Sequence, residues 1–122
     1  MRKFLFFLGV ALTVISCKED GISLEVQNSS ASDINQVICY RVMTGDTVLA
    51  KDIIKAGEIS TSSLEKSEDR LSYNFILEFT RANGSKETTI ETLNVNKDTQ
   101  SAKIQFIVDE TSIKTNCEVV AK

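Results

Sequence analysis

The chain has 122 residues, with 14 Lys and Arg against 17 Asp and Glu, a formal net charge of −3, and no His. This length suits one domain, and the excess of acid argues against a nucleic-acid binder, which depends on clustered cations. Without His there is no Ser-His or Cys-His nucleophilic pair and no His metal ligand. We therefore expect a protein that is not an enzyme and that uses no cofactor.

The first 17 residues have the pattern of a secretory leader. Two cations precede an apolar stretch over residues 4–15, as in a signal peptide, and this stretch is shorter than the roughly 20 apolar residues that cross a bilayer. Val14-Ile15-Ser16-Cys17 resembles the lipobox of bacterial lipoproteins. The resemblance implies that residues 1–16 are a lipoprotein signal peptide and that acylated Cys17 anchors the protein to a membrane through its lipid.

Residues 17–21 form a charged linker behind this leader. Lys18-Glu19-Asp20 resembles the short export tag of Bacteroidota surface lipoproteins, which implies a place on the outer membrane at the cell surface. A plain spacer, with the domain on the periplasmic face, is the alternative. Because the residues after Cys17 carry 12 cations against 17 anions, a net charge of −5, we expect the lipid and not charge to hold the protein on an anionic bilayer.

Strand patterns begin directly after the linker. Residues 22–27 alternate apolar and polar side chains, which is typical of a half-buried strand. Residues 35–43 are apolar on both faces, so we expect a central strand covered on both sides, or a strand that changes sides at a bulge. A turn at residues 44–46 leads into a strand over 47–54, and residues 58–64 form a weak edge strand or a loop.

The second half of the chain contains the strongest strand, over residues 70–80, in which five large apolar side chains face one way. Asn83-Gly84 predicts a type I′ hairpin turn, which needs a positive φ at both central residues, and the chain returns over 86–93. After a polar loop, two further strands are expected over 102–108 and 112–120.

These elements predict one all-β domain over residues 22–122. Seven to eight short strands with a turn about every ten residues favour an antiparallel β-sandwich, with a small β-barrel as the alternative. On this pattern the domain resembles the Ig-like or transthyretin-like sandwiches of small uncharacterised lipoproteins of Bacteroidota. Because the chain has no Pro, we expect Lys86, Glu87 and Glu91 to protect an edge strand by charge.

Two cysteines remain after the anchor. Cys39 and Cys117 both lie on apolar strand faces of an exported chain, and such a pair predicts a disulfide in an oxidising compartment. Two separate buried thiols are the alternative, because an unpaired Cys packs like a small apolar side chain.

Candidate sites of other kinds are weak. The carboxylates of Glu65, Glu68, Asp69, Asp109 and Glu110 lie in predicted turns, where no apolar pocket raises their pKa for acid catalysis. The spacing Asn94-x-Asn96-x-Asp98 places oxygen atoms at alternate positions, but it lacks the Gly and Glu of a calcium loop, so we expect no metal.

One surface motif points to a modification. Asp46-Thr47-Val48 resembles the O-glycosylation motif of Bacteroidota proteins, and it lies beside a predicted hairpin tip. The resemblance implies that Thr47 carries a glycan. The large aromatic side chains of residues 73, 75, 79 and 106 are expected in the core, which leaves no flat aromatic platform for sugar binding.

Together these features predict a lipid-anchored lipoprotein of the cell envelope that acts as a non-catalytic binding or structural accessory, with an envelope protein as its partner. The alternative is a lipoprotein inhibitor of an enzyme such as a lysozyme or a protease. Lysozyme inhibitors of this kind use a loop with Ser, Gly and Tyr, and no such loop is found in the sequence.

Overall fold

A computed structural model describes residues 21–66 and 71–121 of the chain. Residues 1–20, 67–70 and 122 lie outside the described residues, and with them the signal peptide, Cys17, the Lys18-Glu19-Asp20 triplet and two of the carboxylates considered above, Glu68 and Asp69. Within the described ranges, no helix is both long and apolar enough to span a membrane.

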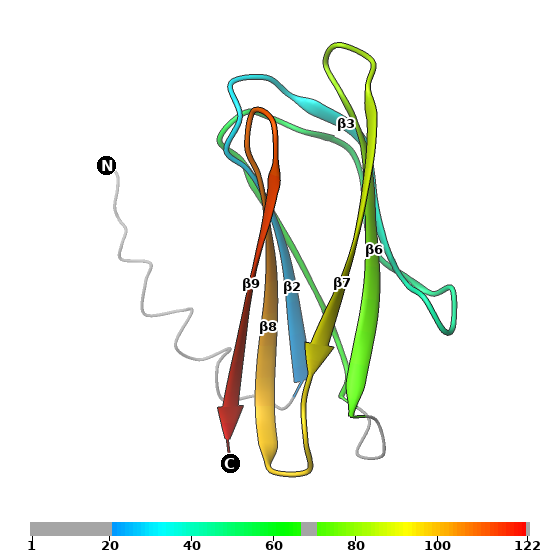
Figure 1. The fold of residues 1–122 in the computed structure, drawn as a ribbon, viewed down its shortest axis with the longest axis vertical. Coiled ribbons are helices and arrows are strands. Elements are labelled where there is room, and N and C mark those ends of the chain that lie inside the picture. The colour runs from blue at the N-terminus through cyan, green and yellow to red at the C-terminus, as the bar shows by residue number, and fades with distance from the viewer. Residues whose placement is uncertain (1–20, 67–70, 122) are drawn as a thin grey trace.

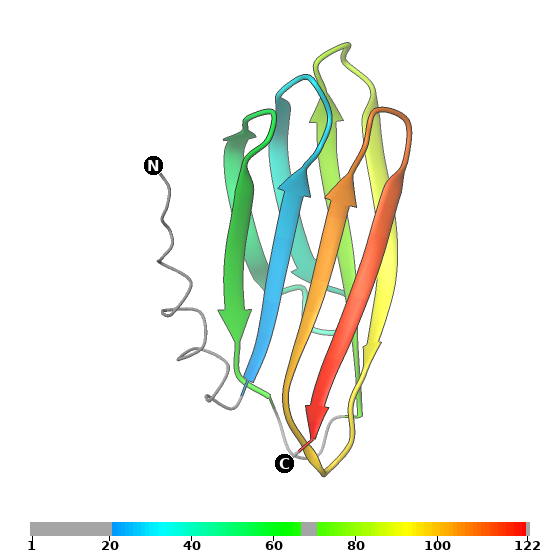
Figure 2. The same cartoon turned by 90° about the vertical axis from the view of Figure 1, so that its left-hand side faces the viewer.

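The described residues form eight strands in two four-stranded sheets that pack face to face (Figures 1 and 2). One sheet has the order β5 (Ile59–Leu64), β2 (Gly21–Asn28), β8 (Thr99–Val108), β9 (Ile113–Ala121). The other has the order β4 (Thr47–Ile54), β3 (Ile34–Arg41), β6 (Ser72–Arg81), β7 (Lys86–Asn94). The predicted β-sandwich is therefore confirmed, and the barrel alternative is wrong because the two sheets stay separate.

Neighbouring strands run antiparallel except for β2 and β8, which run parallel. Lettered A to H in chain order, the sheets read D-A-G-H and C-B-E-F. This order differs from the ABED and CFG sheets of an immunoglobulin constant domain. Strands β4 and β5 contact each other along one side of the sandwich, and β7 and β9 do so along the other.

The weak segment over 58–64 is an edge strand and not a loop. Strand β5 pairs with β2 from Ile22 opposite Leu64 to Gln27 opposite Ile59. The hydroxyl of Ser62 also donates a hydrogen bond of 2.5 Å to the carbonyl of Val48 on β4. This bond joins the two sheets where their edges meet.

The hairpin between β6 and β7 has the predicted place but a different turn. Gly84 has φ 91°, and its amide donates to the carbonyl of Arg81 at 2.8 Å. Asn83 does not share the positive φ that a type I′ turn requires, because Gln36 is the one described residue other than Gly with such a value. The prediction of type I′ is wrong, and the connection is a three-residue loop that ends on a left-handed Gly.

Strand β3 contains the bulge that its two apolar faces suggested. Its pairing with β6 shifts between Asn35 and Ile38, and its pairing with β4 shifts between Cys39 and Tyr40. Gln36, inside the first shift, has φ 50°, a left-handed conformation that costs a residue with a side chain on the order of 1 kcal/mol. Past the bulge Ile38 and Tyr40 lie half-buried on the outer face of the sheet, and Cys39 lies in the core.

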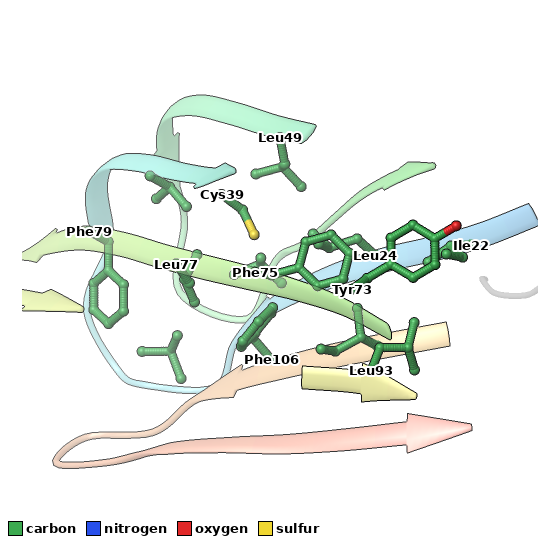
Figure 3. Packing of buried hydrophobic residues seen from close by; sticks show 14 of the residues in the cluster. Ile22, Leu24, Cys39, Leu49, Tyr73, Phe75, Leu77, Phe79, Leu93 and Phe106 are labelled. Atoms are coloured by element: carbon green, nitrogen blue, oxygen red, sulfur yellow. The ribbon is translucent and has the colours of Figure 1, made fainter. Parts of the chain in front are cut away.

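The core lies between the sheets and follows the predicted alternation (Figure 3). Each fully buried large apolar side chain contributes about 1.5–3 kcal/mol to the free energy of unfolding. Tyr73 and Phe75 stack with a distance of 6.4 Å between ring centroids. The fully buried members with the largest side chains come from both sheets, and they include Tyr73, Phe75, Phe106, Ile22, Leu24, Ile34, Ile54, Leu77, Leu93 and Ile104.

The predicted disulfide between Cys39 and Cys117 does not form, and both thiols are free. Cys39 is buried on β3, in the interior of one sheet, whereas Cys117 is exposed on β9, at the edge of the other. The edge strand β4 contacts β5, and the edge strand β7 contacts β9. The next strands inward from β4 and β5 are β3 and β2, so β3 faces β2 across the core. Strand β9 lies two strand spacings from β2, about 10 Å to the side, beyond the reach of a disulfide.

Candidate functional site

The loops at one end of the sandwich form the best candidate site. Strand β2 begins at the opposite end (Figures 1 and 2), and its first residue is Gly21, where the described domain begins. We call residues 29–33, 55–58, 82–85 and 109–112 the distal loops, because they lie beyond the ends of β2, β4, β6 and β8 that are farthest from Gly21. Strand β2 separates the two ends by its eight residues, about 26 Å of extended chain.

A pocket of about 180 Å³ opens among three of the distal loops. Its lining is mostly polar and combines segments that are far apart in the sequence. The lining residues are Ser30, Ser32, Asp33, Ile34, Arg81, Ala82, Asn83 and Glu110.

Buried Asn28 holds the first of these loops in shape. Its side-chain oxygen accepts hydrogen bonds from the amide of Ser30 at 3.0 Å and from the hydroxyl of Ser30 at 2.6 Å. Its side-chain nitrogen donates to the carbonyls of Ser32 at 2.8 Å and Ile54 at 3.0 Å. All four hydrogen-bonding positions of this amide are used, so Asn28 connects the end of β2 to the loop after it and to the end of β4.

Two carboxylates connect the distal loops to one another. Glu110 accepts a hydrogen bond of 2.5 Å from the amide of Ala31, across 79 residues of sequence. Asp33 accepts one of 3.0 Å from the amide of Ala56. Because each carboxylate accepts from the backbone of a different loop, the pocket has a defined shape.

Arg81 supplies the positive charge of the pocket. Its guanidinium forms an ion pair with Glu87, donates to the carbonyl of Asp109 at 2.8 Å and lies 5.4 Å from the ring centroid of Phe79. The side chain is only 11% exposed. Arg81 is therefore chiefly a structural cation that connects the β6–β7 hairpin to the loop after β8.

The pocket offers hydroxyl, amide and carboxylate groups beside a comparable share of apolar surface, and its polar groups suit hydrogen bonds to a partner. Among the described residues, no group of three or more Cys, Asp or Glu side chains could hold a metal ion. Asp109 and Glu110, which the sequence places in a turn, lie at this site. Sequence reasoning missed Asn28, whose only signal is a polar side chain at an inward position of a strand.

Other residues singled out in the sequence lie away from the pocket. Thr47 is the first residue of β4 and is exposed, as is Asp46 before it. In the loop before β8, the side-chain oxygen of Asn96 accepts a hydrogen bond from the amide of Asp98 at 2.8 Å. This Asx turn gives the Asn-rich spacing a structural role.

The two thiols and Tyr40 have shifted pKa values. Burial raises the pKa of the Cys39 thiol to about 12. Partial burial, and then the negative charge of Glu91, raise the pKa of Cys117. On the outer face of the sheet, Tyr40 donates a hydrogen bond of 2.6 Å to Glu78, and this bond raises the pKa of the phenol.

No known protein family matches the chain, and no curated protein is significantly similar to it in sequence. Among solved structures, an NMR structure of a protein from Eubacterium rectale has a similar fold. The similarity covers 84% of this chain and 91% of that chain, with a TM-score of 0.51 and 12% sequence identity. At this identity the similarity concerns the fold alone, and it agrees with the β-sandwich described above.

Proposed function

We propose that this protein is a lipid-anchored lipoprotein of the bacterial outer membrane that binds an envelope partner through its distal loops, without catalysing a reaction. The observation that carries the proposal is the position of Gly21. The domain begins there, four residues after Cys17 and at the end opposite the distal loops. Lipid on Cys17 would therefore direct the pocket away from the membrane surface.

The pocket residues favour binding over chemistry. Glu110, Asp33 and Arg81 are each engaged by backbone or side-chain partners within the protein. A general acid or a nucleophile needs a neighbouring group that shifts its pKa or takes its proton. The exposed groups at the rim, Ser32 and Asn83, are neutral and suit hydrogen bonds to a partner surface.

The proposal extends to location and modification. We place the domain on the outer leaflet, directed by Lys18-Glu19-Asp20, and assign a glycan to Thr47, whose exposure at the start of β4 supports access by a transferase. Labelled fatty acid should appear on the wild type and be absent from Cys17→Ser. Protease added to intact cells should digest the wild-type domain and spare a variant with Ala at residues 18–20 that is equally acylated.

The binding role is tested by capture of the full lipoprotein from cross-linked cells of the native host. We expect Ser32→Lys and Asn83→Lys, at the rim of the pocket, to lose a partner that the wild type retains. Asn94→Lys is the matched control, because Asn94 is exposed at the other end of the β6–β7 hairpin. Equal capture by all variants would refute the distal site, and a captured glycosidase or protease would favour the inhibitor alternative.

A further inference from the structure

Strand β9 is an edge strand that contacts β7 of the other sheet but lacks the inward-facing charges that β7 carries. Long unpaired edges associate with other strands unless they are short, covered or charged on the inward face. The edges of β4 and β5 contact each other, and Ser62 bonds across them. Strand β7 carries half-buried Glu87 and Glu91 on its inward face, opposite buried Phe79 and Phe75.

Strand β9 has neutral residues at the corresponding positions. The residues directly opposite the buried side chains of β8 face inward, and they are Ile113, Thr115, Cys117 and Val119. Val119 is 47% exposed. The charges of this strand, on Lys114 and Glu118, lie on the outward face, where they do not prevent another strand from approaching.

The pairing with β8 decides which backbone groups of β9 point to the unpaired edge. The amide of Asp109 donates to the carbonyl of Ser112 at 2.8 Å, and hydrogen-bonded and non-hydrogen-bonded pairs alternate along an antiparallel ladder. Residues 112, 114, 116 and 118 therefore direct their amides and carbonyls toward β8. Those of residues 113, 115, 117 and 119 point outward from the sheet, where no described strand pairs with them.

We propose that β9 pairs antiparallel with β9 of a second copy, about a two-fold axis at Asn116. This register places Lys114 opposite Glu118 of the second copy, and Glu118 opposite its Lys114, so both ion pairs form by symmetry. It also places Thr115 opposite Cys117 and Ile113 opposite Val119 on the inward face. Shifting the axis to residue 115 or 117 keeps the hydrogen-bond alternation but leaves Lys114 and Glu118 without opposite charges.

The geometry of the proposed register suits these pairs. Residues 114, 116 and 118 occupy non-hydrogen-bonded sites at the new interface, where opposite Cβ atoms are closest, about 4.5–5.5 Å. In the single copy Lys114 pairs with Asp109 at 3.5 Å, but its side chain is 71% exposed. An exposed ion pair of this kind contributes little, so Lys114 is available to Glu118 of the second copy. The inference does not depend on the proposed function.

The register is tested by cross-linking in cells that produce the full chain, with Cys117→Ser added to remove the exposed thiol. In this background Asn116→Cys places two thiols on the axis, about 4.5 Å apart at Cα, within disulfide range. Glu118→Cys is the matched control, also exposed and outward. Its two thiols would lie about 13 Å apart along the strands.

We expect Asn116→Cys to form a disulfide-linked dimer at least tenfold faster than Glu118→Cys. Equal rates, or faster linkage through wild-type Cys117 than through Asn116→Cys, would overturn the register. An adduct between Asn116→Cys and a different protein would overturn the choice of a second copy as partner.

Charge reversal provides an independent test in the Asn116→Cys background. Lys114→Glu or Glu118→Lys alone creates two like-charge pairs, and we expect each to lower the dimer yield by about tenfold. The double variant Lys114→Glu with Glu118→Lys restores opposite charges and should restore the yield. The double variant has the same composition as the unreversed chain. Single variants that leave the dimer yield unchanged, or a double variant that does not recover it, would overturn the proposal.

Discussion

Asn28 and Ser30 form a closed pair of hydrogen bonds at the base of the distal loops. The amide and the hydroxyl of Ser30 both donate to the same side-chain oxygen of Asn28, at 3.0 and 2.6 Å. Both residues are buried, where a polar group without a partner costs about 1–3 kcal/mol. The pair therefore gives the loop after β2 one conformation and sets one wall of the pocket.

Asn28→Ala should lower the free energy of unfolding by about 2–3 kcal/mol, because the amide of Ser30 and the carbonyl of Ile54 lose the Asn28 side chain as their partner, whereas the Ser30 hydroxyl can still donate to the carbonyl of Ser32 at 2.9 Å. Urea denaturation of the purified protein measures this change. Asn94→Ala, at an exposed position, is the control and should change stability by less than about 0.5 kcal/mol. Equal effects of the two substitutions would contradict the role assigned to Asn28.

Gln36→Gly should stabilise the fold by about 0.5–1 kcal/mol, because Gly adopts a φ of 50° without steric cost. The side chain of Gln36 contributes only one long hydrogen bond, with Thr80 at 3.4 Å. Gln27→Gly is the matched control. On β2 the same substitution should destabilise by a similar amount, and a loss of stability in both variants would refute the strain at Gln36.

The two thiols should differ in reactivity toward a disulfide reagent. We expect Cys117, which is exposed, to react in the native protein, and Cys39, which is buried, to react only after denaturation. Without reductant, each chain should have the mass expected when Cys39 and Cys117 are both free thiols. A two-proton deficit assigned to a bond between Cys39 and Cys117 would mean that the sheets can rearrange to bring these residues together.

Stability should fall as the pH rises from about 9 toward 12. The unfolded Cys39 thiol ionises at its ordinary pKa of 9.0, whereas burial holds its folded pKa at about 12. The contribution of this neutral thiol is therefore complete below the unfolded pKa and is lost as pH rises toward the folded value. Cys39→Ala should reduce the slope of unfolding free energy against pH in this window, and an unchanged slope would exclude Cys39 as its cause.

Glu78→Gln should lower the pKa of Tyr40. The phenol donates to Glu78 at 2.6 Å, and this hydrogen bond is the main cause that raises its pKa above 10.0, followed by desolvation and by the charge of Glu78. Titration of phenolate absorbance measures the change. The chain has two tyrosines, and the titration that is absent from Tyr40→Phe is the one that belongs to Tyr40. In the control Glu118→Gln, on the other sheet, the pKa of Tyr40 should stay at its wild-type value.

The sequence alone was enough to predict most strands of this protein. Strands β2, β6 and β8 have an apolar residue at every second position over most of their length, and a strand buried on one face requires that period. The edge role of β7 also follows from its sequence, since Glu87 and Glu91 lie on the inward face of an edge strand. This alternation can be read from the sequence because successive side chains of an extended chain point to opposite faces, whatever the strand pairs with.

Only the tertiary structure decided which strands meet. Cys39 and Cys117 both lie at inward-facing strand positions, but their environments differ because β3 is interior to one sheet and β9 is the edge of the other. Asn28, Glu110 and Arg81 meet at the distal loops for the same reason. Alternation along a strand determines which side chains face inward, whereas the order of strands in the sheets, set by packing across the whole core, determines what those side chains contact.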